Sequence, residues 1–161
     1  MLTVHTSGGH EMLEAAVKAA KEQAKKLKVK PPLMVGVTVL TSQAPTLRSG
    51  YAPTVPSGQV KEDKLQALVL DRALLAKRAG LDGVVASVEE VPLIRRYCPK
   101  NFIIVTPGIR PEGSQAGDQK RIATPKMAIH SGSNYLVVGR PIVQADNPLK
   151  AAKNILKEIS C

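Results

Sequence analysis

Residues 102–121 read Phe-Ile-Ile-Val-Thr-Pro-Gly-Ile-Arg-Pro-Glu-Gly-Ser-Gln-Ala-Gly-Asp-Gln-Lys-Arg. The first four residues are apolar and β-branched or aromatic, which is typical of a short buried strand. The glycines and prolines that follow exclude a continued strand or a helix, so a long polar loop begins where the strand ends. Because a strand and a helix bracket this loop closely, the sequence predicts a functional loop.

An alternation of apolar runs and helical patterns extends in both directions from this stretch. The apolar runs that predict strands are residues 2–5, 34–40, 83–86, 102–105 and 135–138. The patterns that predict helices cover residues 10–27 and about 65–79. A short helix is expected to start near residues 89–92, another runs from 125 to its end at Gly132, and the last one starts at 148. A strand followed by a helix, repeated along the chain, is typical of a parallel α/β protein.

Each long predicted helix has one apolar face, and its ends carry residues typical of helix caps. The predicted inward residues are Leu13, Val17, Ala20, Ala24 and Leu27 in the first helix, Leu65, Leu68, Leu75 and Ala79 in the second, and Leu149, Ala152, Leu156 and Ile159 in the last. The predicted end signals are Gly80 and Gly132 after helices, and Thr124-Pro125 and Asn147-Pro148 before them.

The fold class is therefore α/β, with two architectures open. The strands are almost continuously apolar, as expected where helices cover a parallel sheet. A doubly wound sheet and a (β/α) barrel both fit the alternation. Five strands are too few to close a barrel, so the chain would form part of one. We expect residues 1–161 to form one domain, with residues 41–60 as an extended loop.

The charge balance favours an anionic partner without identifying it. The 161-residue chain has 23 Lys and Arg against 13 Asp and Glu, a net charge of +10. One Phe, three Tyr and no Trp leave few aromatic side chains for stacking on nucleic-acid bases. Many of the lysines, as in residues 18–30, are spaced as a solvated helix face. These features argue against nucleic acid as the partner.

Cysteine usage and hydropathy give further expectations. Cys98 and Cys161 are distant and form no CxxC pair, which argues against a zinc site or a disulfide framework. His5, His10 and His130 lack metal-ligand spacing. The chain has no leader pattern and no apolar run long enough to cross a bilayer, so the expectation is a cytoplasmic protein without a membrane partner.

Candidate binding residues fall at the carboxyl ends of the predicted strands, the edge that carries the ligand in parallel α/β folds. Thr41 follows the second strand, Arg110 and Gln119 lie in the loop after the fourth, and Gly139 and Arg140 follow the fifth. Either arginine alone would be read as a surface cation. Two at one edge, one inside a glycine-rich loop and one directly after a glycine, predict a phosphate site.

Several stretches together resemble bacterial orotidine 5′-phosphate decarboxylase. They are residues 2–9, 36–42, 80–85, 105–122 and 139–141, of which Thr-Pro-Gly-Ile-Arg-Pro followed by Gly-Asp-Gln is the most specific. The resemblance implies strands four to eight of a (β/α)8 TIM barrel. It also implies a homodimer that converts orotidine 5′-monophosphate to UMP and carbon dioxide without a cofactor.

The resemblance assigns roles to the same candidate residues. Gly139 and Arg140 would hold the phosphate, and Arg110 would support the ligand from the loop. Gln119 would bridge the phosphate and the base edge, and Thr41 would meet the pyrimidine.

The sequence departs from the family in its catalytic residues. The Asp-x-Lys-x-x-Asp motif on which decarboxylation depends in this family is absent from the chain. We therefore expect no catalytic residue here and no activity from the isolated chain. A truncated gene product and a genuine half-barrel completed by a partner are both open. So are two other functions: another sugar-phosphate lyase of the same barrel superfamily, and a non-catalytic phosphate or nucleic-acid binding fragment.

Overall fold

A computed structural model describes residues 1–40, 64–111 and 123–160. Within them the strands are β1 (Leu2–His5), β2 (Met34–Val37), β3 (Gly83–Val85), β4 (Ile103–Thr106) and β5 (Tyr135–Leu136). The five form a single sheet in the order β1-β2-β3-β4-β5, and every neighbouring pair is parallel. All five predicted strands are thus present, although the second, third and fifth end earlier than their apolar runs do and the fourth is shifted by one residue.

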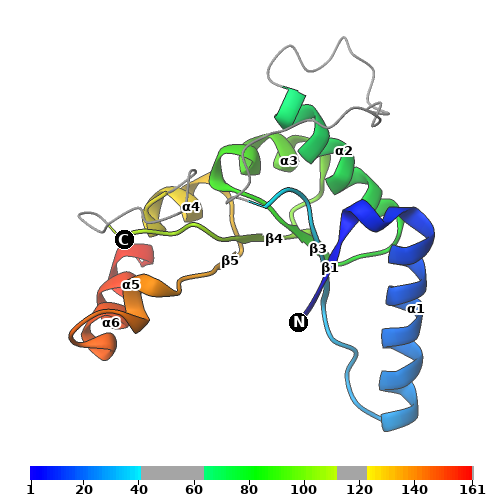
Figure 1. The fold of residues 1–161 in the computed structure, drawn as a ribbon, viewed down its shortest axis with the longest axis horizontal. Helices are drawn as coiled ribbons and strands as arrows, with labels where there is room; N and C mark the ends of the chain where they lie inside the picture. The colour runs from blue at the N-terminus through cyan, green and yellow to red at the C-terminus, as the bar shows by residue number, and fades with distance from the viewer. Residues whose placement is uncertain (41–63, 112–122, 161) are drawn as a thin grey trace.

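Helical segments follow the strands. They are η1 (Thr6–Gly8) and α1 (Gly9–Leu27), α2 (Lys64–Arg78), η2 (Val88–Glu90) and α3 (Val91–Tyr97), α4 (Pro125–Ser131), α5 (Arg140–Val143) and α6 (Pro148–Ile159). Figure 1 shows them along the outside of an arch whose inner side is formed by the strands. The arch is open between α1 at one end and α5 and α6 at the other.

This arrangement decides between the two predicted architectures. A doubly wound sheet reverses its strand order at a switch point and carries helices on both faces. Here each strand lies next to its predecessor, and the helices lie on one side of a curving sheet (Figure 1). Since right-handed crossovers repeated in one direction put every helix on the same side, the chain is a partial (β/α) barrel.

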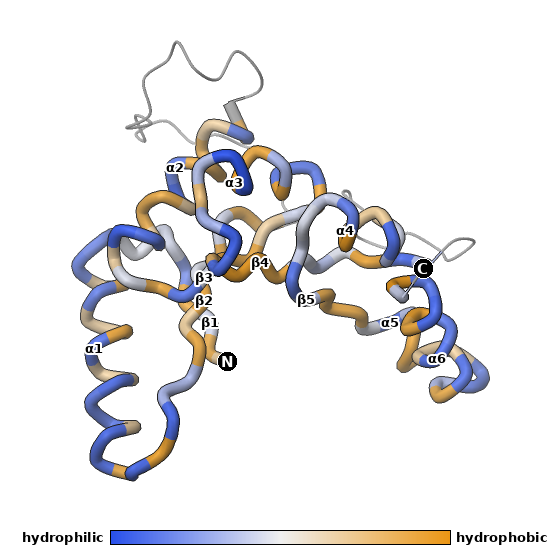
Figure 2. The backbone as a smooth tube through the Cα atoms, turned by 180° about the vertical axis from the view of Figure 1, so that it is seen from behind, coloured by the Kyte–Doolittle hydropathy of each residue, from blue (hydrophilic) through white to orange (hydrophobic). Residues whose placement is uncertain are grey.

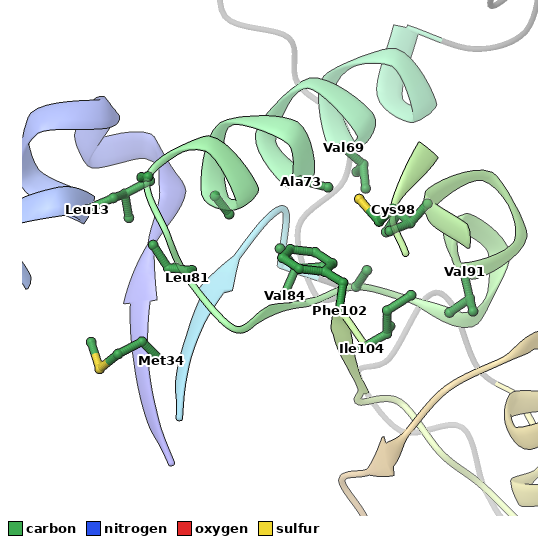
Figure 3. Packing of buried hydrophobic residues seen from close by; sticks show 14 of the residues in the cluster. Leu13, Met34, Val69, Ala73, Leu81, Val84, Val91, Cys98, Phe102 and Ile104 are labelled. Atoms are coloured by element: carbon green, nitrogen blue, oxygen red, sulfur yellow. The ribbon is translucent and has the colours of Figure 1, made fainter. Parts of the chain in front are cut away.

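The main core lies between the sheet and the helices α1, α2 and α3. In Figure 3, Val84, Phe102 and Ile104 lie beneath α2, the helix that carries Val69 and Ala73. The buried members of this core are Leu13, Val17, Met34, Leu65, Val69, Ala73, Ala76, Ala79, Leu81, Val84, Ala86, Val91, Ile94, Cys98, Phe102 and Ile104. Of the inward residues predicted for the second helix, Leu65 and Ala79 are buried and Leu75 is partly buried against this core, and Val69, Ala73 and Ala76 of α2 are buried beside them.

The predicted helix ends are confirmed. Thr124 Oγ1 accepts a hydrogen bond from the Met127 amide at 3.2 Å, and Asn147 Oδ1 accepts one from the Lys150 amide at 2.9 Å. Gly80 and Gly132 follow their helices with φ of +79° and +105°, which L side chains rarely adopt.

The inward faces of α1 and α6 were predicted only in part. Leu27 is 62% exposed because it lies in the last turn of α1, which extends past the sheet (Figure 1). On α6, Ile155 is buried, whereas Leu149 and Leu156 are 66% and 59% exposed. Helix α6 contacts α4 and α5 through a face rotated from the predicted one.

The guanidinium of Arg95 on α3 ties together the amino-terminal side of the sheet. It donates to Gly132 O from Nε at 2.9 Å and from Nη2 at 2.8 Å, and Nη1 donates to Phe102 O at 2.6 Å. Asn134 Oδ1 accepts from the Ile104 amide at 2.8 Å and also from Arg95. These bonds join α3, the start of β4 and the turn before β5.

Candidate functional site

The carboxyl ends of the strands lie at one edge of the sheet because all five strands are parallel. Threonine hydroxyls continue the pairing of the strands there. Thr6, just after β1, donates to Val37 O at 2.8 Å, and Thr38, just after β2, donates to Val85 O at 2.7 Å. Each hydroxyl thus caps the last carbonyl of the next strand. Hydrogen bonds from these hydroxyls therefore hold the strand ends together at this edge of the sheet.

Thr38 also accepts a hydrogen bond from Arg72 of α2. Nη1 of Arg72 donates to Thr38 O, which joins the helix to the end of β2. Burial lowers the pKa of Arg72, and the neighbouring Asp71 carboxylate acts in the opposite direction. The sequence analysis missed this pair. Thr6 directly follows the predicted strand 2–5 and could have been noticed, whereas Thr38 lies inside the predicted strand 34–40 and was marked as a strand-end residue only by the structure.

The two ends of the loop after β4, residues 108–110 and Ala123, are hydrogen-bonded to each other and are called the neck of the loop. Ile109 and Ala123 form an isolated parallel bridge, the Arg110 amide donates to Ala123 O at 2.9 Å, and the Ala123 amide donates to Gly108 O at 3.3 Å. Gly108 has a φ of +76°, which turns the chain out of the strand. The two sides of the neck are therefore hydrogen-bonded to each other just after the end of β4.

A second apolar cluster supports this neck. Its buried members are Val88, Ile109, Ala123 and Ala128, against which Leu136 and Val138 pack. Val88 belongs to η2 after β3, so segments that follow β3, β4 and β5 meet here. In the same turn, Ser87 Oγ donates to the buried Glu90 carboxylate.

Arg110 lies in the neck and is only 7% exposed. Its Nη1 donates to Ile109 O at 2.8 Å. A guanidinium buried to this degree is held in place by its surroundings, unlike the freely solvated cation that a lone surface arginine would be.

Gly139 and Arg140 lie at the carboxyl end of the neighbouring strand. Gly139 is the residue before α5, and its carbonyl accepts the Ile142 and Val143 amides at 2.9 and 3.1 Å. A Cβ built on Gly139 would meet nothing within 4 Å, so the space beside it is open. Arg140, the first residue of α5, is partly buried.

The structure therefore places three of the five candidate residues at the carboxyl ends of β4 and β5. Thr41 and Gln119 lie outside the described residues. His5, the last residue of β1, is exposed at the same edge.

No group of three or more His, Cys, Asp or Glu that could hold a metal ion occurs among the residues that the structure describes. Within the same residues no helix is long and apolar enough to cross a bilayer.

Fold and edge together define a segment of a (β/α)8 barrel whose polar residues gather at the carboxyl ends of its strands. The chain belongs to the orotidine 5′-phosphate decarboxylase / HUMPS family, whose model matches residues 1–155.

Curated relatives and solved structures agree with this membership. The chain is 44% identical to orotidine 5′-phosphate decarboxylase of Syntrophomonas wolfei and 46% identical to that of Moorella thermoacetica. Each alignment includes 99% of this chain, and the two alignments include 64% and 60%, respectively, of the relatives' own lengths. The crystal structure of the Lactobacillus acidophilus enzyme matches 99% of the chain, and 62% of its own, with a TM-score of 0.76 and 34% identity. An uncharacterized conserved protein from Geobacillus kaustophilus matches 98% of the chain, and 62% of its own, with a TM-score of 0.73 and 29% identity. The chain spans about three fifths of the length of these proteins.

Proposed function

We propose that this chain supplies the phosphate- and base-binding half of an orotidine 5′-phosphate decarboxylase, a carboxy-lyase of pyrimidine synthesis in the cytoplasm. The observation that carries the proposal is the placement of Arg110 and Arg140 after the adjacent parallel strands β4 and β5. Two guanidinium groups at one sheet edge suit a phosphate monoester, because each offers a planar fork of N–H donors. The open space beside Gly139 leaves room for the anion.

The remaining assignments complete the site. Gln119 contacts both phosphate and base, and Thr41 contacts the pyrimidine. The ligand is orotidine 5′-monophosphate or UMP, no cofactor takes part, and the full-length enzyme is a homodimer. The similarity to curated decarboxylases at 44–46% identity supports this ligand class over unrelated phosphates.

Catalysis requires groups that this chain does not carry. The chain lacks the Asp-x-Lys-x-x-Asp motif, whose charges stabilise the transition state and protonate the product carbanion in the family. The purified 161-residue chain is therefore expected to bind UMP without releasing carbon dioxide from orotidine 5′-monophosphate. Turnover in a spectrophotometric decarboxylation assay would contradict this expectation.

Ligand-induced thermal protection tests the binding proposal. UMP at a concentration well above its Kd should raise the Tm, because a ligand that binds only the folded state stabilises it. Ribose 5-phosphate and a hexulose phosphate are the comparison ligands, and uridine is the control without phosphate. A Tm that no phosphate ester changes would refute the phosphate site.

Two alternatives are distinguished by the same kind of measurement. The first alternative is another sugar-phosphate lyase activity, because the description of the matched family names HUMPS beside orotidine 5′-phosphate decarboxylase. Protection by sugar phosphates that equals or exceeds protection by UMP would favour it. The second is a binding fragment for nucleic acid that uses the charge of +10. Steeply salt-dependent binding to any polynucleotide would favour that function.

A further inference from the structure

The carboxyl end of α1 carries a dense run of positive charge. Residues 25–30 read Lys-Lys-Leu-Lys-Val-Lys, and all six are exposed. We call these six residues the lysine-rich tip. Its four lysines and no acidic residue give a formal charge of +4, and Glu22 is the nearest acid before it in the sequence. The helix dipole favours cations in the last turn, as at Lys25 and Lys26, but the other two lysines follow the helix.

One of these two lysines occupies a position that favours glycine. Lys28 has a φ of +56° and is the one non-glycine residue with a positive φ among the residues that the structure describes. The corresponding positions after α2 and α4 are Gly80 and Gly132. An L side chain is unfavourable in this conformation, and backbone outliers of this kind cluster at functional positions. The charge of Lys28 is therefore a candidate for a role outside the turn.

Hydrogen bonds fix the backbone of the tip. The Lys28 amide donates to Lys25 O at 3.2 Å, and the Val29 amide donates to Ala24 O at 3.0 Å. Because Ala24 is buried, these bonds anchor the tip to the packed part of α1. The lysines are thus presented from one defined backbone conformation.

Two apolar side chains lie among the lysines. Leu27 is 62% exposed and Val29 is 58% exposed. Figure 2 shows the end of α1 as a hydrophilic trace interrupted by short hydrophobic pieces. A face that only contacts water has no use for an exposed leucine and valine. Apolar side chains surrounded by lysines are instead typical of a segment that lies at the surface of an anionic bilayer.

We propose that the lysine-rich tip binds the surface of an anionic phospholipid membrane. The lysines pair with lipid phosphates, while Leu27 and Val29 enter the boundary between head groups and acyl chains. Figures 1 and 2 both show the end of α1 protruding beyond the sheet, so it can reach a flat surface before the rest of the molecule does. The contact is peripheral and needs no membrane-spanning helix.

The tip and the candidate phosphate site lie at opposite ends of the parallel strands. Helix α1 starts after the carboxyl end of β1 and leads back to the amino end of β2, so the tip lies at the amino-terminal side of the sheet. Arg110 and Arg140 follow the carboxyl ends of β4 and β5. Membrane binding through the tip therefore leaves the nucleotide edge open, and the inference does not rest on the proposed function.

A polynucleotide is the other polyanion that such a charge could attract. Proteins that bind single strands combine a basic groove with aromatic side chains that stack on bases. The tip contains no aromatic residue and is a protruding end rather than a groove. On a sugar-phosphate backbone, its leucine and valine would also stay in water. The composition of the tip thus favours the membrane.

Vesicle sedimentation tests the proposal on the purified chain. The vesicles are phosphatidylcholine with and without phosphatidylglycerol, and a single-stranded oligonucleotide is tested in parallel. The chain should bind only the vesicles that contain phosphatidylglycerol, and added salt should weaken this binding.

A charge-matched pair of variants locates the contact. The combined change Lys26→Gln, Lys28→Gln and Lys30→Gln should lower the vesicle partition coefficient by about tenfold or more. The control removes the same charge from exposed lysines on other segments and should lower it by less than about threefold. These control changes are Lys100→Gln, Lys126→Gln and Lys153→Gln.

Two further variants separate binding from folding. Lys28→Gly supplies the residue that the positive φ favours, so the Tm should stay equal or rise while the partition coefficient falls by about threefold or more. Leu27→Ser with Val29→Ser should lower the coefficient by about tenfold, because the apolar contact with lipid is lost. Met127→Ser, at an exposed position of α4, should change it by less than about twofold.

Three outcomes would overturn the proposal. They are no binding to phosphatidylglycerol vesicles at low salt, vesicle binding that the tip variants and their controls weaken equally, and binding to the oligonucleotide alone that the tip variants abolish. No arm of the test uses UMP, so failure of the membrane site and failure of the nucleotide site are separable.

Discussion

Thr106 at the end of β4 is the parallel register partner of Leu136 at the end of β5. Thr106 Oγ1 also lies 2.6 Å from Ser133 Oγ in the turn that leads into β5, which fixes the two strands to each other. Arg110 and Arg140 each come four residues after a member of this register pair. Arg110 and Arg140 therefore follow neighbouring parallel strands at the same distance along the chain, which is the relationship on which the proposed phosphate site depends.

The first prediction concerns Arg140. Arg140→Ala should weaken UMP binding by about tenfold or more, since a charge-assisted contact to phosphate is lost. Lys25→Ala, on an exposed part of α1, is the control for a change of one positive charge and should alter the Kd by less than about twofold. Isothermal titration calorimetry measures both. Equal changes in the Kd of the two variants would mean that UMP binding depends only on the net charge of the chain.

The second prediction concerns the hydroxyl of Thr38. Thr38→Val removes the bond to Val85 O in a site that is 2% exposed, and should lower the free energy of unfolding by about 1–2 kcal/mol. Thr3→Val, on the exposed part of β1, should change it by less than about 0.5 kcal/mol. Urea titrations give both values. A loss in Thr3→Val as large as that in Thr38→Val would show that the hydroxyl bond is not responsible.

The third prediction concerns the Arg95 clamp. Arg95→Met keeps most of the side-chain volume but leaves Gly132 O and Phe102 O without their donor, so the free energy of unfolding should fall by about 2–3 kcal/mol. Arg96→Met, at the next and exposed position of α3, is the matched control. Similar urea midpoints for the two variants would count against the clamp.

The fourth prediction concerns Cys98. Burial raises the pKa of the Cys98 thiol above its ordinary value of 9.0, and Lys77 and Arg95 only partly oppose this. In a Cys161→Ser background, the thiol should react slowly with a disulfide reagent at pH 8 until denaturant is added. Rapid reaction of the native chain would contradict a buried, protonated thiol.

The same shift has a consequence for stability. Because the folded-state pKa lies above the unfolded one, the thiol's contribution to stability is fully present below about pH 9 and is lost as the pH rises through the folded pKa. Between pH 8 and 10.5, wild type should lose more stability than Cys98→Ala in urea titrations. Parallel losses in the two proteins would remove Cys98 as the cause.

Much of the chain's local structure follows from the sequence alone. The apolar runs, the caps at Thr124 and Asn147 and the left-handed glycines at 80 and 132 depend on neighbours within a few residues, so their chemistry is legible in the sequence. The motif around Arg110 likewise marked the family, which the match over residues 1–155 confirms.

Only the tertiary structure decided how these elements are arranged. The strand order, the placement of every helix on one side, and the exposure of Leu149 and Leu156 depend on segments far apart in the chain. An amphipathic pattern indicates that one face of a helix is suited to burial. Which surface covers that face depends on how the other helices and the sheet pack around it. On α6 the face that contacts α4 and α5 contains Ile155 rather than Leu149 and Leu156, which is why its inward face was predicted only in part from the sequence.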